Sequence, residues 1–166
     1  MSGLKSFVPI AALLAALTAL GCAPAPVVGR PATAASAAPS APADQGGRRS
    51  LVFVLTTGLE DMQMMTSAFR HARVAMEQKK LDEVTVLIYG RGVHAVDGAI
   101  SARPPQLSAL IRDAMTAGVH VQVCAHALAN MGIGPEKLDP PGVEIVPNAM
   151  ITLVDDVARG AAIVRY

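Results

Sequence analysis

The chain has 166 residues, of which 52% are hydrophobic and only 3% aromatic, and its formal net charge at pH 7 is +1. Its 14 Lys and Arg residues are scattered, and aromatic residues that could stack on bases are scarce. Nucleic-acid binding requires a basic surface or such stacking residues, so we expect no nucleic-acid partner.

Residues 1–22 have the pattern of an export signal. Lys5 gives the start a positive charge, and the apolar run at 7–20 is shorter than the roughly 20 residues that span a membrane. The run ends in ALGC at 19–22, which resembles the lipobox of bacterial lipoproteins. This resemblance implies that Cys22 is acylated and anchors the protein to a lipid membrane, with the domain facing the periplasm in the bacterial cell envelope.

Two other interpretations of the start remain open, namely cleavage near Ala23 or Ala25 and an uncleaved anchor. Residues 23–49 are rich in Ala, Pro, Ser and Gly and have no hydrophobic period, which predicts a disordered tether. Residues 50–166 are long enough for one domain with a single core.

Five short runs rich in β-branched residues predict strands, at 51–55, 84–89, 119–124, 143–147 and 161–165. Helical patterns lie between them: 61–80, Pro104-Pro105 to Gly118, 125–131, and Asn148, a candidate N-cap, to Gly160. The alternation predicts a single α/β domain with a five-stranded, mainly parallel sheet flanked by helices. Strands with almost continuous apolar residues are typical of a sheet covered on both faces.

Apolar residues of three helical patterns recur at helical spacing, so we expect them to face the core. They are Met62, Met65, Phe69, Ala72 and Met76 in the first, Leu107, Leu110, Ile111, Ala114 and Met115 in the second, and Met150, Leu153, Val154 and Val157 in the last.

The Gly-rich segment at 90–103 is long for a connection in a compact domain, and such loops are often functional or mobile. It contains His94, which is a candidate to reach a binding site. The alternative is that His94 is a solvated loop residue.

Several familiar sites have no match in the sequence. The turn after the first strand, Thr56-Thr57-Gly58, lacks the glycines of a dinucleotide or phosphate loop, and neither CxxC nor GxSxG occurs. His120, Cys124 and His126 do not have zinc-ligand spacing. We therefore predict no cofactor and no metal, although metal or haem binding through histidines remains an alternative.

Cys124 is the main candidate for chemistry, because it ends a predicted strand and begins a helical pattern. Ligands of α/β sheets bind at such ends, and a helix N-terminus favours a thiolate. His126, in the first turn of the helix, is a candidate to stabilise that thiolate. The alternatives are that Cys124 is a small buried hydrophobic residue and His126 a surface residue. With Cys22 acylated, Cys124 has no disulfide partner in the chain.

The segments AGVHVQVCAHALANMGIGPEKL (117–138) and GVEIVPNAMITLVDDVARGAAIVRY (142–166) resemble the DsrE/DsrF-like family. The resemblance implies a five-stranded parallel sheet and a homo-oligomer, either a trimer or a hexamer. It also implies sulfur handling through a persulfide on Cys124, as a sulfurtransferase or sulfur carrier, with the sulfur donor and acceptor unknown. The alternative is a non-catalytic oligomeric binding or scaffold lipoprotein of the same fold.

A flavodoxin-like strand order would place the third strand beside the first. Cys124 would then face the first turn, and Thr56, Thr57 and Gly58 would line a small pocket with it.

Overall fold

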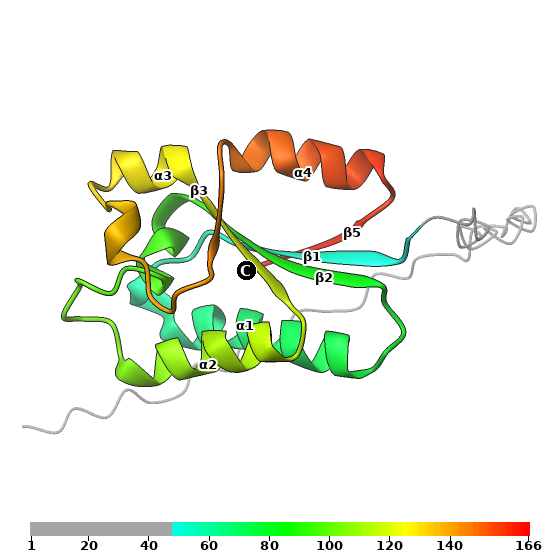
Figure 1. Ribbon diagram of the computed structural model, residues 1–166, viewed down its shortest axis with the longest axis horizontal. Coiled ribbons are helices and arrows are strands. Elements are labelled where there is room, and N and C mark those ends of the chain that lie inside the picture. The colour runs from blue at the N-terminus through cyan, green and yellow to red at the C-terminus, as the bar shows by residue number, and fades with distance from the viewer. Residues whose placement is uncertain (1–47) are drawn as a thin grey trace, which may run out of the picture. The chain divides into compact units, whose positions relative to one another are not determined.

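Five parallel strands form the sheet of the computed structural model, which describes residues 48–166 (Figure 1). They are β1 (Ser50–Leu55), β2 (Glu83–Ile88), β3 (His120–Cys124), β4 (Glu144–Val146) and β5 (Ala162–Arg165). Each lies where a strand was predicted, and the parallel α/β fold is confirmed. The predicted signal peptide, Cys22 and nearly all of the predicted tether lie outside the described residues.

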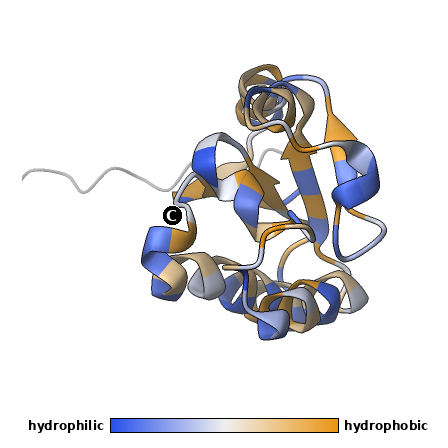
Figure 2. Cartoon of the chain, turned by 90° about the vertical axis from the view of Figure 1, so that its left-hand side faces the viewer, coloured by the Kyte–Doolittle hydropathy of each residue, from blue (hydrophilic) through white to orange (hydrophobic). Residues whose placement is uncertain are grey.

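Four α-helices cover the sheet, namely α1 (Met62–Glu77), α2 (Pro105–Thr116), α3 (Ala125–Asn130) and α4 (Ala149–Ala158). Short 3-10 helices precede or connect them: η1 (Leu59–Asp61), η2 (Gly90–Ala95) and η3 (Pro135–Lys137). Helices α1 and α2 lie on one face of the sheet, and α3 and α4 lie on the other (Figure 1). Figure 2, which views the chain after a turn of 90° from Figure 1, shows the largely hydrophobic strands between the two helical layers.

The predicted flavodoxin-like strand order is wrong. The order is β4-β3-β2-β1-β5, so β2 separates β3 from β1. Strand β2 pairs with β1 along its whole length, from Ser50↔Glu83 to Leu55↔Ile88, and its other edge pairs with β3. Because β5 occupies the free edge of β1, no edge of β1 remains for β3.

The predicted core faces of α1 and α2 are confirmed. The buried residues of the two helices include Met65, Phe69 and Ala72 in α1 and Leu107, Ile111 and Ala114 in α2. They pack against the central strands, in which Leu55, Val86 and Ile88 are completely buried. The main hydrophobic core therefore lies between β1 and β2 and the α1–α2 layer.

The predicted inward face of α4 is wrong for three of its four residues. Met150, Val154 and Val157 are 52%, 62% and 55% exposed, and only Leu153 is partly buried against the core. Strand β5 is also exposed throughout. The physical reason is that β5 is an edge strand that pairs on one side only. Few residues of α4 contact the sheet, and Ala149 is the one that is fully buried.

The first half of the segment at 90–103 is packed rather than open, whereas most of residues 98–102 are exposed. It forms η2, whose residues Gly92, Val93 and Ala95 are buried. A Cβ at Gly92 would lie 2.5 Å from the Leu55 carbonyl oxygen, so a side chain at this position would clash with the end of β1. The first half of the segment is thus part of the core wall.

Arg103 ties this segment to the residues that lead into β4. Its side chain is only 6% exposed and its Nη1 lies 2.6 Å from Oδ2 of Asp139. It also donates from Nε to the Ala95 carbonyl at 2.7 Å and from Nη2 to the Asp139 carbonyl at 2.8 Å. The guanidinium holds the pKa of Asp139 below its ordinary value, mainly through the hydrogen bond to the carboxylate.

We predict that Arg103→Met lowers the free energy of unfolding by about 2 kcal/mol at pH 7, because it leaves two carbonyls without their donor and takes the cation from a carboxylate that is 36% exposed and so partly screened by water. Folding lowers the pKa of Asp139, so the stabilisation is complete above the unfolded value of about 4 and is lost as pH falls through the native value. The difference between wild type and variant should therefore shrink below about pH 4, as measured by urea unfolding at several pH values.

Arg73→Met is the matched control, because Arg73 pairs with Glu77 but its side chain is 41% exposed. It should cost less than about 1 kcal/mol. Equal losses in the two variants, or a pH-independent loss in Arg103→Met, would contradict the assigned role of the Arg103–Asp139 pair.

Candidate functional site

Cys124 lies at the junction between β3 and α3. It is the last residue of the strand and the N-cap residue of the helix, with φ −73° and ψ 117°. It is 5% exposed and is the free cysteine of the described part of the chain. The predicted strand-to-helix position is confirmed, and the thiol is largely buried without being sealed, because it lines a cavity.

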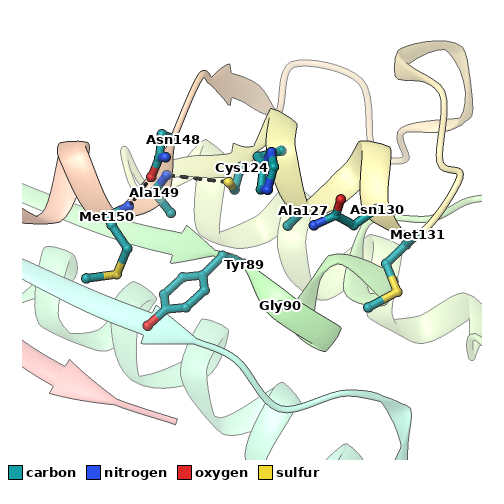
Figure 3. A pocket seen from close by; sticks show the side chains of 10 residues that line it. Tyr89, Gly90, Cys124, Ala127, Asn130, Met131, Asn148, Ala149 and Met150 are labelled. Carbon is teal, nitrogen blue, oxygen red and sulfur yellow. Dashed lines mark hydrogen bonds between the residues drawn. The ribbon is translucent and has the colours of Figure 1, made fainter.

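The cavity has a volume of about 300 Å³ and lies at the carboxyl ends of β2, β3 and β4 (Figure 3). Its lining comes from three segments that follow these strands. They contribute Tyr89 and Gly90 after β2, Cys124, His126, Ala127, Asn130 and Met131 at β3 and α3, and Asn148, Ala149 and Met150 after β4. Gly90 has φ 57°, which favours glycine at the turn out of β2.

The Cys124 sulfur accepts a hydrogen bond from the start of α4. The backbone N–H of Ala149, the first residue of that helix, lies 3.4 Å from Sγ (Figure 3). The first N–H groups of a helix have no partner within the helix, so the sulfur satisfies one of them. Asn148 satisfies the next, because its side chain accepts from the Met150 N–H at 2.9 Å. The predicted N-cap role of Asn148 is confirmed.

The start of α4 is therefore directed at the Cys124 sulfur. An N–H directed at a sulfur bonds more strongly to a thiolate than to a thiol, and the positive end of the α4 dipole adds to this. Ala149 is 1% exposed, so the hydrogen bond is shielded from water. Sequence reasoning did not identify Ala149, because its approach to Cys124 follows from β4 pairing with β3.

Neutral side chains line the cavity. Met131 and Met150 are 42% and 52% exposed, and they lie on opposite sides of Cys124 (Figure 3). His126 also lines the cavity and is exposed, so the structure places both predicted residues of this segment at one site. No Lys, Arg, Asp or Glu lies among the lining residues.

Thr56, Thr57 and Gly58 do not line this cavity, because β2 lies between β1 and β3. Thr56 instead donates from Oγ1 to the Tyr166 carbonyl at 3.1 Å, which fixes the chain's last residue against the end of β1. The Gly58 N–H donates to Oε1 of Glu60 at 3.2 Å.

The other histidines considered as candidates lie elsewhere. His94 is half-buried in η2, outside the cavity, and its Nδ1 has no hydrogen-bond partner among residues 48–166. His120 is exposed, and its Nδ1 lies 3.4 Å from Oε1 of Glu144. Within the described residues, no three His, Cys, Asp or Glu side chains are grouped closely enough to hold a metal ion.

Between residues 48 and 166, no helix is both long enough and apolar enough to cross a membrane.

Three solved structures share the fold. A protein of unknown function from Methanobacterium thermoautotrophicum is 19% identical with a TM-score of 0.61, and the match covers 71% of this chain and 99% of that one. The ychN protein from E. coli is 20% identical with a TM-score of 0.59, and the match again covers 71% and 99%. A conserved protein of unknown function from Bacteroides thetaiotaomicron is 16% identical with a TM-score of 0.56, covering 70% and 94%.

Among curated protein sequences, none matches this chain significantly. Residues 49–166, which include every strand and helix described above, match the model of the DsrE/DsrF-like family. The chain belongs to the DsrE/DsrF-like family.

Proposed function

We propose that Cys124 carries sulfane sulfur as a persulfide, so that the protein acts as a sulfur carrier or sulfurtransferase. The observation that supports this most directly is the Ala149 N–H···Sγ hydrogen bond at the floor of a cavity. In the proposed reaction, the Cys124 thiolate attacks the sulfane sulfur of a donor, and the donor's former partner atom leaves with the electron pair. Passing the sulfur to an acceptor thiolate reverses the step.

The surroundings of Cys124 suit a persulfide as well as a thiolate. A cavity of about 300 Å³ has room for an added sulfur atom beside the largely buried Sγ. A persulfide anion there would lie at the same helix N-terminus, where negative charge is stabilised. His126 lines the cavity and is proposed to assist as a cation when it is protonated.

We propose that the protein works in the bacterial cell envelope, anchored through acylated Cys22 and facing the periplasm. The support is the lipobox-like sequence at 19–22 after an apolar run. The sulfur donor and acceptor there are unknown.

We also propose that the chain forms a homo-oligomer through an apolar surface, here named the α4–β5 patch. The patch consists of Met150, Ile151, Val154 and Val157 on α4 and Ile163 on β5. These side chains are 39% to 63% exposed, and β5 has an unpaired edge. An apolar surface beside an open strand edge is typical of an association site.

The α4–β5 patch also supports the alternative function, a non-catalytic oligomeric binding or scaffold lipoprotein. In that case, Cys124 would be a packed residue, and assembly alone would account for the protein's role.

We predict that the reduced protein, treated with inorganic polysulfide, gains the mass of one sulfur atom at Cys124 and loses it on addition of dithiothreitol. Cys124→Ser should gain none while keeping the same circular dichroism spectrum and oligomeric state. Peptide mass spectrometry measures the adduct. A native, folded protein whose Cys124 resists every sulfane donor would leave only the scaffold function.

We predict that Ala149→Pro slows alkylation of Cys124 by iodoacetamide about tenfold at pH 7, because it removes the N–H that stabilises the thiolate. Proline is tolerated at the first position of a helix, and Asn148 already has the extended backbone that precedes proline. Ala149→Val is the matched control, since it adds bulk and keeps the N–H. Equal rates in the two variants would show that the hydrogen bond does not activate the thiol.

We predict that Val154→Lys shifts the protein to smaller species in sedimentation velocity, because it places a charge in the α4–β5 patch. Val74→Lys is the control, since Val74 is 50% exposed but lies on α1, on the opposite face of the sheet. A monomeric wild type, or dissociation caused equally by both variants, would argue against the proposed interface.

A further inference from the structure

We infer that the sulfur donor for Cys124 is an organic persulfide whose carbon portion is uncharged and apolar, rather than a sulfur oxyanion such as thiosulfate. This inference rests on the proposed persulfide function and adds the chemical class of the donor. It follows from the side chains that line the cavity and from the hydrogen-bond donors that are already occupied there.

No permanently charged side chain lies in the cavity to receive an oxyanion, and its one histidine, His126, is exposed to solvent. The ten lining residues include neither Lys nor Arg. Moving an ionised group out of water costs several kcal/mol unless it is paired or hydrogen-bonded. Sites for sulfate-like anions normally provide Arg, Lys or several free N–H groups.

The first two N–H groups of α4 already have acceptors. Ala149 N–H donates to the Cys124 sulfur, and Met150 N–H donates to the Asn148 side chain. Peptide dipoles add along a helix, so α3, with six residues, contributes a smaller field than a long helix. The polarity at the start of α4 therefore serves the sulfur of Cys124 rather than a separate anion.

The remaining walls suit an apolar group. Ala127 is 8% exposed and lies beside the thiol, and Met131 and Met150 lie on either side of it (Figure 3). Methionine side chains are flexible and polarisable, and they adapt to ligands of irregular shape. Met131 is 42% exposed and lies outside the α4–β5 patch, so a bound apolar group would remove its surface from water. A volume of about 300 Å³ is at the lower end for small-molecule pockets and exceeds what one sulfur atom needs.

The transfer needs no additional oxidant or reductant. The Cys124 thiolate attacks the terminal sulfur of R–S–SH, and a new S–S bond forms at Sγ. The S–S bond of the donor breaks, and its inner sulfur leaves as R–S⁻ with the electron pair. The product is Cys124–S–SH, and the released thiolate takes a proton from water according to pH.

The test compares two persulfides whose carbon portions differ by one carboxylate. Reduced full-length protein is mixed at pH 7 with the persulfide of benzyl mercaptan or that of 4-(mercaptomethyl)benzoate, and with thiosulfate. Loading of Cys124 is followed by mass spectrometry, and the same reactions on urea-unfolded protein give the intrinsic reactivity of each donor. We expect native protein to prefer the benzyl donor about tenfold over its unfolded-state ratio, with no loading by thiosulfate.

A native ratio equal to the unfolded one, or faster loading by thiosulfate, would overturn the inference while leaving the persulfide function intact. Absence of loading by every donor would instead overturn the proposed function and the inference with it.

Two variants test the role of the cavity itself. Met150→Lys places a cation at the lining and should cancel the preference for the benzyl donor. Ile151→Lys is the matched control, because Ile151 is the adjacent exposed residue of the α4–β5 patch and does not line the cavity. It should keep the preference, and the same loss in both variants would show that the cavity lining does not select the donor.

Discussion

Parallel pairing of β2, β3 and β4 is the constraint on which the candidate site depends. Ile88 pairs with Val123, and Cys124 pairs with Val146, so the three strands end at one edge of the sheet. The chain after each strand therefore contributes one wall of the cavity, although Tyr89 and Ala149 are far apart in the sequence. A hydrogen bond between the start of α4 and the end of β3 then fixes the thiol.

The weakest part of this framework is β4, which has only three residues and lies at an edge. The Arg103–Asp139 pair holds the segment just before β4 against the packed first half of the segment at 90–103. Asp139 N–H also donates to the Val96 carbonyl at 2.9 Å. These contacts place the start of α4, so a partly buried ion pair outside the cavity supports the position of the N–H that meets Cys124.

Local sequence patterns predicted every strand and α-helix but none of the 3-10 helices, because alternation of β-branched runs and helical spacing depends on neighbouring residues. They did not predict strand order, since the same alternation is compatible with several orders, and register depends on distant contacts. Cys124 and His126 were identified because they share one local segment. Ala149 and Met150 were missed as site residues because their proximity to Cys124 depends on which strands are neighbours.

The wrong prediction for α4 has a similar cause. A row of apolar residues at helical spacing shows that one face avoids water, but it does not show what covers that face. Met150, Val154 and Val157 have the core pattern and are exposed in the single chain. In the proposed oligomer, a second copy of the chain covers this apolar face, which the sheet was expected to cover.

The central claim is that Cys124 accepts sulfur inside the cavity, held by the N-terminus of α4. A high-resolution crystal structure of the protein after treatment with an organic persulfide tests it most directly. The account predicts density for an extra sulfur on Sγ, directed into the cavity and within hydrogen-bond distance of the Ala149 N–H. An unmodified Cys124 in such crystals, after a treatment that loads sulfur onto Cys124 of the urea-unfolded protein, would contradict it.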